Sequence, residues 1–173
     1  MRSAGPLLAL ALLAGCGGPD EPAQESTDTL RPALGETPTA LPPQAADFPV
    51  LASSDCGEVA AFYADSIARR EYAQAALVWD DPVIDAARIE AVFGGYAEPS
   101  VDWEEPSTEG AAGSLYCTLE GRLTDAGDPA KAAVEGAVVL RRVNDVPGAT
   151  PDQLRWTLQS STFVENLERS RRS

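Results

Sequence analysis

The spacing of apolar residues changes once along this chain, and that change constrains the fold more than any other feature. Between residues 55 and 98, apolar side chains recur at the spacing of an amphipathic helix. From residue 101 to about residue 163, they alternate with polar side chains, as in strands that bury one face. Helices followed by strands within one folded segment indicate an α+β fold.

The first part of this segment predicts three helices. The first covers residues 56–70, with Asp55 as its N-cap. The second covers residues 72–79 and ends at Asp80-Asp81-Pro82, and the third ends by Pro99 at the latest. The apolar residues that mark the three helices are Val59, Phe62, Tyr63 and Ile67; then Tyr72, Ala76 and Trp79; then Ile89, Val92, Phe93 and Tyr96.

The second part predicts about four strands. A short strand begins at Val101, and a loop at residues 109–114 leads to a longer strand over residues 115–123. The next strand covers residues 134–143, and the last begins at Leu154 and runs to about Phe163. Turn-forming residues make the connections short, so we expect consecutive strands to pair antiparallel.

The N-terminus has the features of a secretory signal peptide at residues 1–15. Arg2 precedes an apolar run at residues 7–13, which is too short to cross a hydrocarbon core of ~30 Å as a helix. The run ends in Leu13-Ala14-Gly15-Cys16, which closely resembles the bacterial lipobox. The resemblance implies cleavage before Cys16 and lipid modification of its nucleophilic thiol.

Residues 16–54 are expected to form a disordered acidic spacer that starts at the lipidated cysteine. The segment has no apolar periodicity, and one basic residue, Arg31, accompanies six acidic ones. Such a composition buries too little surface to offset the entropy of ordering. The folded domain is expected at residues 55–165, with a frayed basic tail at residues 166–173. Seven of the 14 prolines fall in the spacer, namely Pro19, Pro22, Pro32, Pro38, Pro42, Pro43 and Pro49.

Composition excludes several classes of function. The formal net charge is −14, so the chain repels nucleic acid and is not attracted to anionic lipid head groups. Any membrane attachment must therefore be hydrophobic. The sequence contains no histidine, which excludes Ser-His-Asp and Cys-His catalysis and argues against the usual catalytic zinc sites. We expect no cofactor and no metal, because Asp80, Asp81 and Asp85 lack the spacing of a calcium loop.

Two stretches of the domain resemble known proteins. Residues 62–67, followed by Glu71-Tyr72, Ala75-Ala76 and Trp79, are similar to the opening of the NTF2-like (SnoaL and ketosteroid-isomerase-like) fold. Residues 140–150, with Trp156 beyond them, resemble uncharacterised proteobacterial lipoproteins. The resemblance implies an NTF2-like cone, in which three N-terminal helices pack on a curved antiparallel sheet of about four strands. It implies little about activity, because this fold hosts many functions.

The same resemblance suggests two catalytic candidates. In ketosteroid-isomerase-like proteins a tyrosine of the first helix donates to a developing oxyanion, and an aspartate moves the proton. Tyr63 corresponds to the tyrosine, and Asp85 lies near where the base could fall. The strand at residues 134–143 departs from the pattern, because it supplies no aspartate as a second donor.

Cys56 and Cys117 are the two cysteines that remain once Cys16 is lipidated. An even number of cysteines in an oxidising compartment suggests a disulfide, which would join the start of the first helix to the second strand. The alternative is that they are two separate small core residues, since Cys117 lies on the apolar face of its strand.

These features predict a lipid-anchored protein of the cell envelope that faces the periplasm. Gly17 follows Cys16 where an aspartate would favour the inner membrane, so the outer membrane is slightly favoured. The function expected is a non-catalytic module that binds an envelope protein or a small ligand. The alternative functions are an isomerase or hydratase that uses Tyr63 and Asp85, and a purely structural envelope protein.

Overall fold

The first helix begins where Asp55 caps it. The carboxylate of Asp55 accepts a hydrogen bond from the backbone N–H of Gly57 at 2.7 Å, and α1 (Cys56–Ala68) follows. A short α2 (Tyr72–Ala76) and then α3 (Ala86–Phe93) complete the predicted set of three. The predicted apolar faces of α1 and α3 are largely buried, and in α1 the buried face includes Val59, Tyr63 and Ile67. The second helix was predicted to reach residue 79 but ends at Ala76, so Trp79 lies beyond it.

The computed structural model describes residues 41–171. The predicted signal peptide, Cys16 and most of the predicted spacer lie outside these residues. Within the described part, no helix has both the length and the apolar character needed to cross a membrane.

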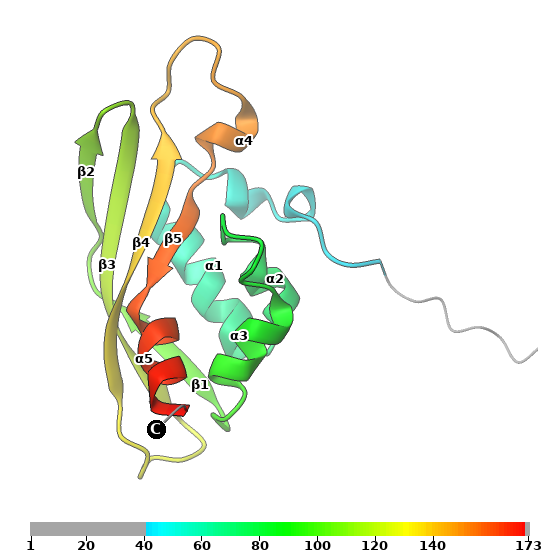
Figure 1. Ribbon diagram of the computed structural model, residues 1–173, viewed down its shortest axis with the longest axis vertical. Helices are drawn as coiled ribbons and strands as arrows, with labels where there is room; N and C mark the ends of the chain where they lie inside the picture. Colours follow the sequence, from blue (N-terminus) through cyan, green and yellow to red (C-terminus); the bar gives the residue numbers. More distant parts are fainter. Residues whose placement is uncertain (1–40, 172–173) are drawn as a thin grey trace, which may run out of the picture. The chain divides into compact units, whose positions relative to one another are not determined.

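The strands form one open sheet of five, and the first three α-helices pack on one side of it (Figure 1). The strand order is β1-β3-β4-β5. The strand β2 pairs with β3 along the same edge as β1, opposite β4. All these pairings are antiparallel, as the short connections predicted, and one parallel bridge joins Trp79 to Leu158. The α+β class is therefore confirmed. The strands are β1 (Pro99–Trp103), β2 (Ser107–Ala111), β3 (Ser114–Asp125), β4 (Val134–Val143) and β5 (Thr157–Ser161).

The prediction of about four strands missed β2. Residues 109–114 were expected to form a loop, whereas residues 107–111 pair with β3 through a tight turn at Ala112 and Gly113. Both turn residues have positive φ, 40° and 87°, which suits a two-residue hairpin turn. All five β2 residues are exposed, so no alternation of apolar residues marks this strand in the sequence.

The last predicted strand was also wrong at both ends. Leu154 belongs to α4 (Pro151–Leu154), where Thr150 and Gln153 cap the helix reciprocally. Phe163 belongs to α5 (Thr162–Arg171), which includes most of the residues expected as a frayed tail. Phe163 and its neighbour Val164 are both buried, and a strand with one covered face cannot bury two consecutive side chains.

The folded segment includes residues before the predicted boundary at residue 55. Two short 3₁₀ helices, η1 (Ala45–Asp47) and η2 (Pro49–Ala52), precede α1. Leu51 is 1% exposed and belongs to the core, and Phe48 packs against Phe62 of α1 with ring centroids 5.1 Å apart. Helices of three and four residues are too short to produce an apolar period, so the sequence did not distinguish them from the spacer.

Two facing glycines shape the middle of the sheet. Gly121 of β3 is opposite Gly136 of β4. The ring of Trp103 lies against Gly121, and the ring of Phe163 lies against Gly136. The two rings meet edge to face with centroids 5.8 Å apart, so the missing side chains make room for an aromatic pair that attaches α5 to the sheet.

We expect Gly121→Ala to destabilise the protein. The added Cβ would lie 2.5 Å from Cε3 of Trp103 and 2.9 Å from the backbone oxygen of Asp102. Overpacking of this kind costs about 1–3 kcal/mol of unfolding free energy, which chemical denaturation would measure. Gly110→Ala is the control, because its Cβ would meet only the Leu115 side chain at 3.8 Å. Equal stability of the two variants would contradict the close packing described here.

Candidate functional site

Tyr63 lies in the interior of the domain. Its side chain is 1% exposed, and its hydroxyl has no hydrogen-bond partner among the described residues. Burial raises the pKa of Tyr63 well above its ordinary value, although the neighbouring Trp79, whose ring lies edge-on to the tyrosine, opposes the rise. The hydroxyl is therefore held neutral and shielded from water.

Asp85 lies at the surface, at the start of α3. Its carboxylate accepts a hydrogen bond from the backbone N–H of Arg88 at 2.8 Å, and this bond caps the helix. Neither Asp85 nor Tyr63 lines the three pockets described below. Tyr63 is enclosed in the core, whereas Asp85 is exposed at the start of α3. The structure therefore does not place the two catalytic candidates where both could act on one substrate.

The other acidic residues that could have suggested a site have local partners. The Asp81 carboxylate accepts from the N–H of Val83 at 2.9 Å, and that of Asp80 accepts from Gln159 at 3.2 Å. No group of three or more potential metal ligands occurs among residues 41–171.

Asp125 is buried, and its carboxylate holds the start of β1. Hydrogen bonds from the backbone N–H of Glu98, and then of Ala97, lower its pKa, and Lys131 adds to this effect while burial opposes it. These contacts hold the backbone before β1 in place, so they account for the carboxylate without a ligand.

Cys56 and Cys117 form a disulfide. Cys56 is the first residue of α1, and Cys117 is in β3 with 0% exposure. The bond closes a sequence separation of 61 residues and attaches the first turn of α1 to the inner face of the sheet. Closing so long a loop limits the unfolded chain, which stabilises the fold by roughly 2–4 kcal/mol.

We expect Cys56→Ala/Cys117→Ala to lower the free energy of unfolding by about 2–4 kcal/mol, measured by denaturation without reductant. A Cys16→Ala background removes the third thiol. In that background, denatured and unreduced protein should react with no thiol reagent, and reduced protein should react at two positions. Two reactive thiols before reduction would refute the disulfide.

Three arginines line a pocket of about 340 Å³ at one end of the sheet. Its walls come from the end of β4, from α4 and from the start of β5, which lie together in Figure 1. We call this site the arginine pocket. Its lining residues are Asp80, Arg141, Arg142, Val143, Asp152, Gln153, Arg155 and Thr157.

Each arginine of this pocket is anchored by an uncharged group. Arg141 donates through Nε and Nη2 to Oγ of the buried Ser114, at 3.1 and 2.8 Å. Arg155 donates to the carbonyl oxygen of Leu77 at 3.1 Å. Arg142 lies over the ring of Trp156, 5.5 Å from its centroid. None of these anchoring groups is a carboxylate, although Asp80 and Asp152 also line the pocket.

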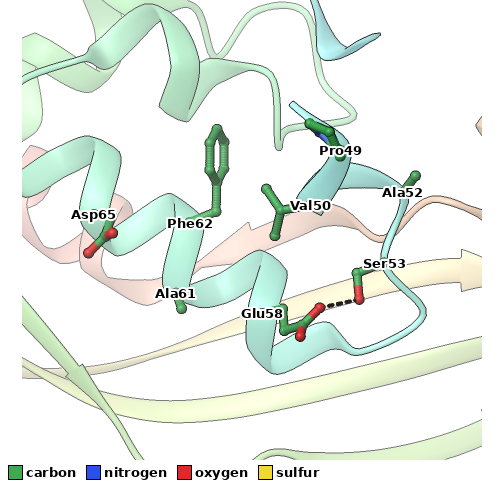
Figure 2. Close-up of a pocket in the computed structure, with 8 residues that line it drawn as sticks. All are labelled: Pro49, Val50, Ala52, Ser53, Glu58, Ala61, Phe62 and Asp65. Atoms are coloured by element: carbon green, nitrogen blue, oxygen red, sulfur yellow. Dashed lines mark hydrogen bonds between the residues drawn. The ribbon is translucent and has the colours of Figure 1, made fainter. Parts of the chain in front are cut away.

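A larger, shallow groove of about 730 Å³ lies between η2 and α1. Figure 2 shows its two sides, with Val50 on η2 and Phe62 on α1. Glu58 and Asp65 lie along the groove, and Glu58 accepts a hydrogen bond from Ser53 at 2.6 Å. Because its charged side chains are carboxylates, this groove has the opposite electrostatic character to the arginine pocket.

The third pocket, of about 190 Å³, lies between β5 and the helices α3 and α5. Arg88 pairs with Glu168 across it at 2.8 Å, and the carboxylates of Asp81 and Glu165 also line it, so its charged side chains are mostly acidic. The indole N–H of Trp79, at its edge, has no hydrogen-bond partner among the described residues.

Sequence reasoning missed the arginine pocket. Arg141 and Arg142 were visible within the stretch that resembles other lipoproteins, but they were placed in a strand and assigned no role. Arg155 was expected in the same strand as Leu154, whereas α4 ends there and turns the chain. The arginines come from separate segments, so no local pattern in the sequence marks them as a group.

Comparison with family models, with curated proteins and with solved structures gave no match for this chain.

Proposed function

We propose that this protein is a membrane-anchored lipoprotein of the cell envelope whose folded domain is a non-catalytic binding or interaction module. We propose further that the domain is an NTF2-like cone. The observed order of three helices followed by an antiparallel sheet supports this finer assignment.

One observation carries the choice of binding over catalysis. The hydroxyl of Tyr63 is enclosed by the core, while the carboxylate of Asp85 is exposed and caps α3. A general acid or base must reach the substrate proton within hydrogen-bond distance, directly or through one water. The two candidates share none of the three pockets described above, which favours binding over the isomerase or hydratase alternative.

The sequence supports the anchor. The lipobox Leu13-Ala14-Gly15-Cys16 supplies the modification site, and acyl chains contribute about 0.8 kcal/mol for each buried CH₂. The net charge of −14 provides no attraction to anionic lipids, so the acyl chains must supply the attachment. The disulfide Cys56–Cys117 is compatible with the oxidising space in which such a protein would face the periplasm, at the outer membrane in preference to the inner.

We expect Cys16→Ala to move the protein from the membrane fraction to the soluble fraction. The variant lacks the thiol that carries the acyl chains, and the rest of the chain has no other attachment in this proposal. Fractionation with palmitate labelling in a Gram-negative host measures both effects. Cys117→Ala is the matched control and should stay labelled and membrane-bound. A labelled or membrane-bound Cys16→Ala protein would overturn the proposed anchor.

We expect Tyr63→Phe to leave binding intact and to leave stability unchanged or raised by up to about 1 kcal/mol. The substitution removes a buried hydroxyl that lacks a partner, and such groups cost free energy. Thermal denaturation measures the stability, and in vivo crosslinking compares the captured partners with those of the wild type. Tyr116→Phe, at an exposed hydroxyl, is the control. Loss of a cellular phenotype in Tyr63→Phe with stability and partners unchanged would instead support catalysis.

A further inference from the structure

We propose that the arginine pocket binds a small oxyanion, a ligand that presents a phosphate or carboxylate group. This inference rests on the proposed function, because it gives the binding module a ligand class. A volume of about 340 Å³ is suited to a small molecule.

None of the three arginines has an acidic partner among the described residues, and outside the pocket Arg70 shares this property, since it donates to the carbonyl oxygens of Tyr96 and Ala97. Arg69, Arg88 and Arg122 each pair with a carboxylate at 2.8–3.2 Å. No carboxylate of the described residues lies within 4.0 Å of the guanidinium groups that line the pocket. The chain has 27 acidic and only 13 basic residues, so unpaired arginines that share one pocket are a departure from its general composition.

The guanidinium groups also keep donors available. Each has five N–H donors, and its hydrogen bonds within the protein use one or two of them. The Nε atoms of Arg142 and Arg155 have no partner among the described residues, but both are buried, so a ligand would meet the Nη hydrogens of these arginines. Oxygen atoms of phosphate or carboxylate match this fork of donors, and arginines that are already anchored lose less side-chain freedom on binding.

The surroundings favour a small anion over a long one. Asp80 and Asp152 also line the pocket, but both are exposed, whereas the three arginines are partly buried. Charge is screened less in a partly buried position than in an exposed one. Beyond the pocket, the net charge of −14 repels an extended polyanion, so a ligand with one or two anionic groups is the better fit.

The test is a titration of the full-length Cys16→Ala protein with inorganic phosphate and, separately, with succinate. Sodium chloride keeps the ionic strength constant, so that general screening does not contribute. We expect a saturable rise in melting temperature with at least one anion, and the comparison of the two identifies phosphate or carboxylate as the preferred group. No saturable rise with either anion would overturn the proposal.

Matched variants locate the site. Arg155→Gln should weaken the apparent affinity about tenfold or more, because one charge-assisted contact is lost. Arg122→Gln removes the same charge from an exposed arginine that pairs with Glu135 on the same sheet, and it should bind as the wild type does. Equal weakening in both variants would show an effect of overall charge and overturn the assignment to this pocket.

A measurement on the unaltered pocket protects the test against a variant that fails to fold. Arg142 lies over Trp156, so an anion that binds Arg142 should change the fluorescence of this indole. We expect a saturable change with the same midpoint as the thermal titration, and none in Trp156→Phe. A thermal shift without this fluorescence change would place the anion elsewhere and refute the proposal. Either failure leaves the anchor untouched, since fractionation of Cys16→Ala tests the anchor independently.

Discussion

The fold depends on the docking of α1 against the inner face of the sheet. The disulfide attaches Cys56 to β3, and the indole of Trp103 donates to the carbonyl oxygen of Ala60 at 3.0 Å. Just before the helix, the indole of Trp156 donates to the carbonyl oxygen of Ser54 at 2.9 Å. The start of α1 is therefore attached to three different strands or strand ends. The apolar stripe of the helix is buried because these contacts fix its direction.

This docking also determines what the catalytic candidates can do. Tyr63 lies on the stripe of α1 that faces the sheet, so its ring fills the core and its hydroxyl is enclosed. Asp85 is at a helix start, where its carboxylate satisfies a backbone donor that would otherwise lack a partner. Core packing accounts for the ring of Tyr63, and helix capping accounts for the carboxylate of Asp85. A similar order of residues along the chain was therefore not enough to infer a shared site. It does not show whether each side chain is enclosed in the core or open to a substrate.

The sequence predicted those helices and strands that are long enough for their apolar residues to repeat at a recognisable spacing. It located α1 and the long strands β3 and β4, whose alternation reflects one covered face. It failed for η2, α4 and β2, which contain four or five residues each. It also failed at Phe163, where an apolar residue just after a strand was taken to continue the strand. Short elements are determined by caps, turns and distant contacts, and a local period does not record these.

The arginine pocket could not be predicted for a related reason. Its arginines come from β4 and from the residue after α4, and Asp80 comes from a segment that pairs with β5 through Trp79 and Leu158. The pairing of β4 with β5, in which Arg141 is opposite Thr157, brings the arginines of β4 close to the start of β5. This pairing joins segments that are distant in the sequence.

The electrostatic consequence of this arrangement follows from the anchors. A guanidinium that pairs with a carboxylate is neutralised, whereas one that donates to Ser114 or to the carbonyl of Leu77 keeps its full charge. The pocket is lined by three arginines and two aspartates, so its lining has a formal charge of +1 in a chain whose net charge is −14. A charge distribution of this form admits an anion whose charge is confined to the pocket and opposes any anion that extends beyond it. The acidic composition therefore limits the size of the proposed ligand. The uncharged anchors leave the arginines charged, which determines that the ligand is an anion.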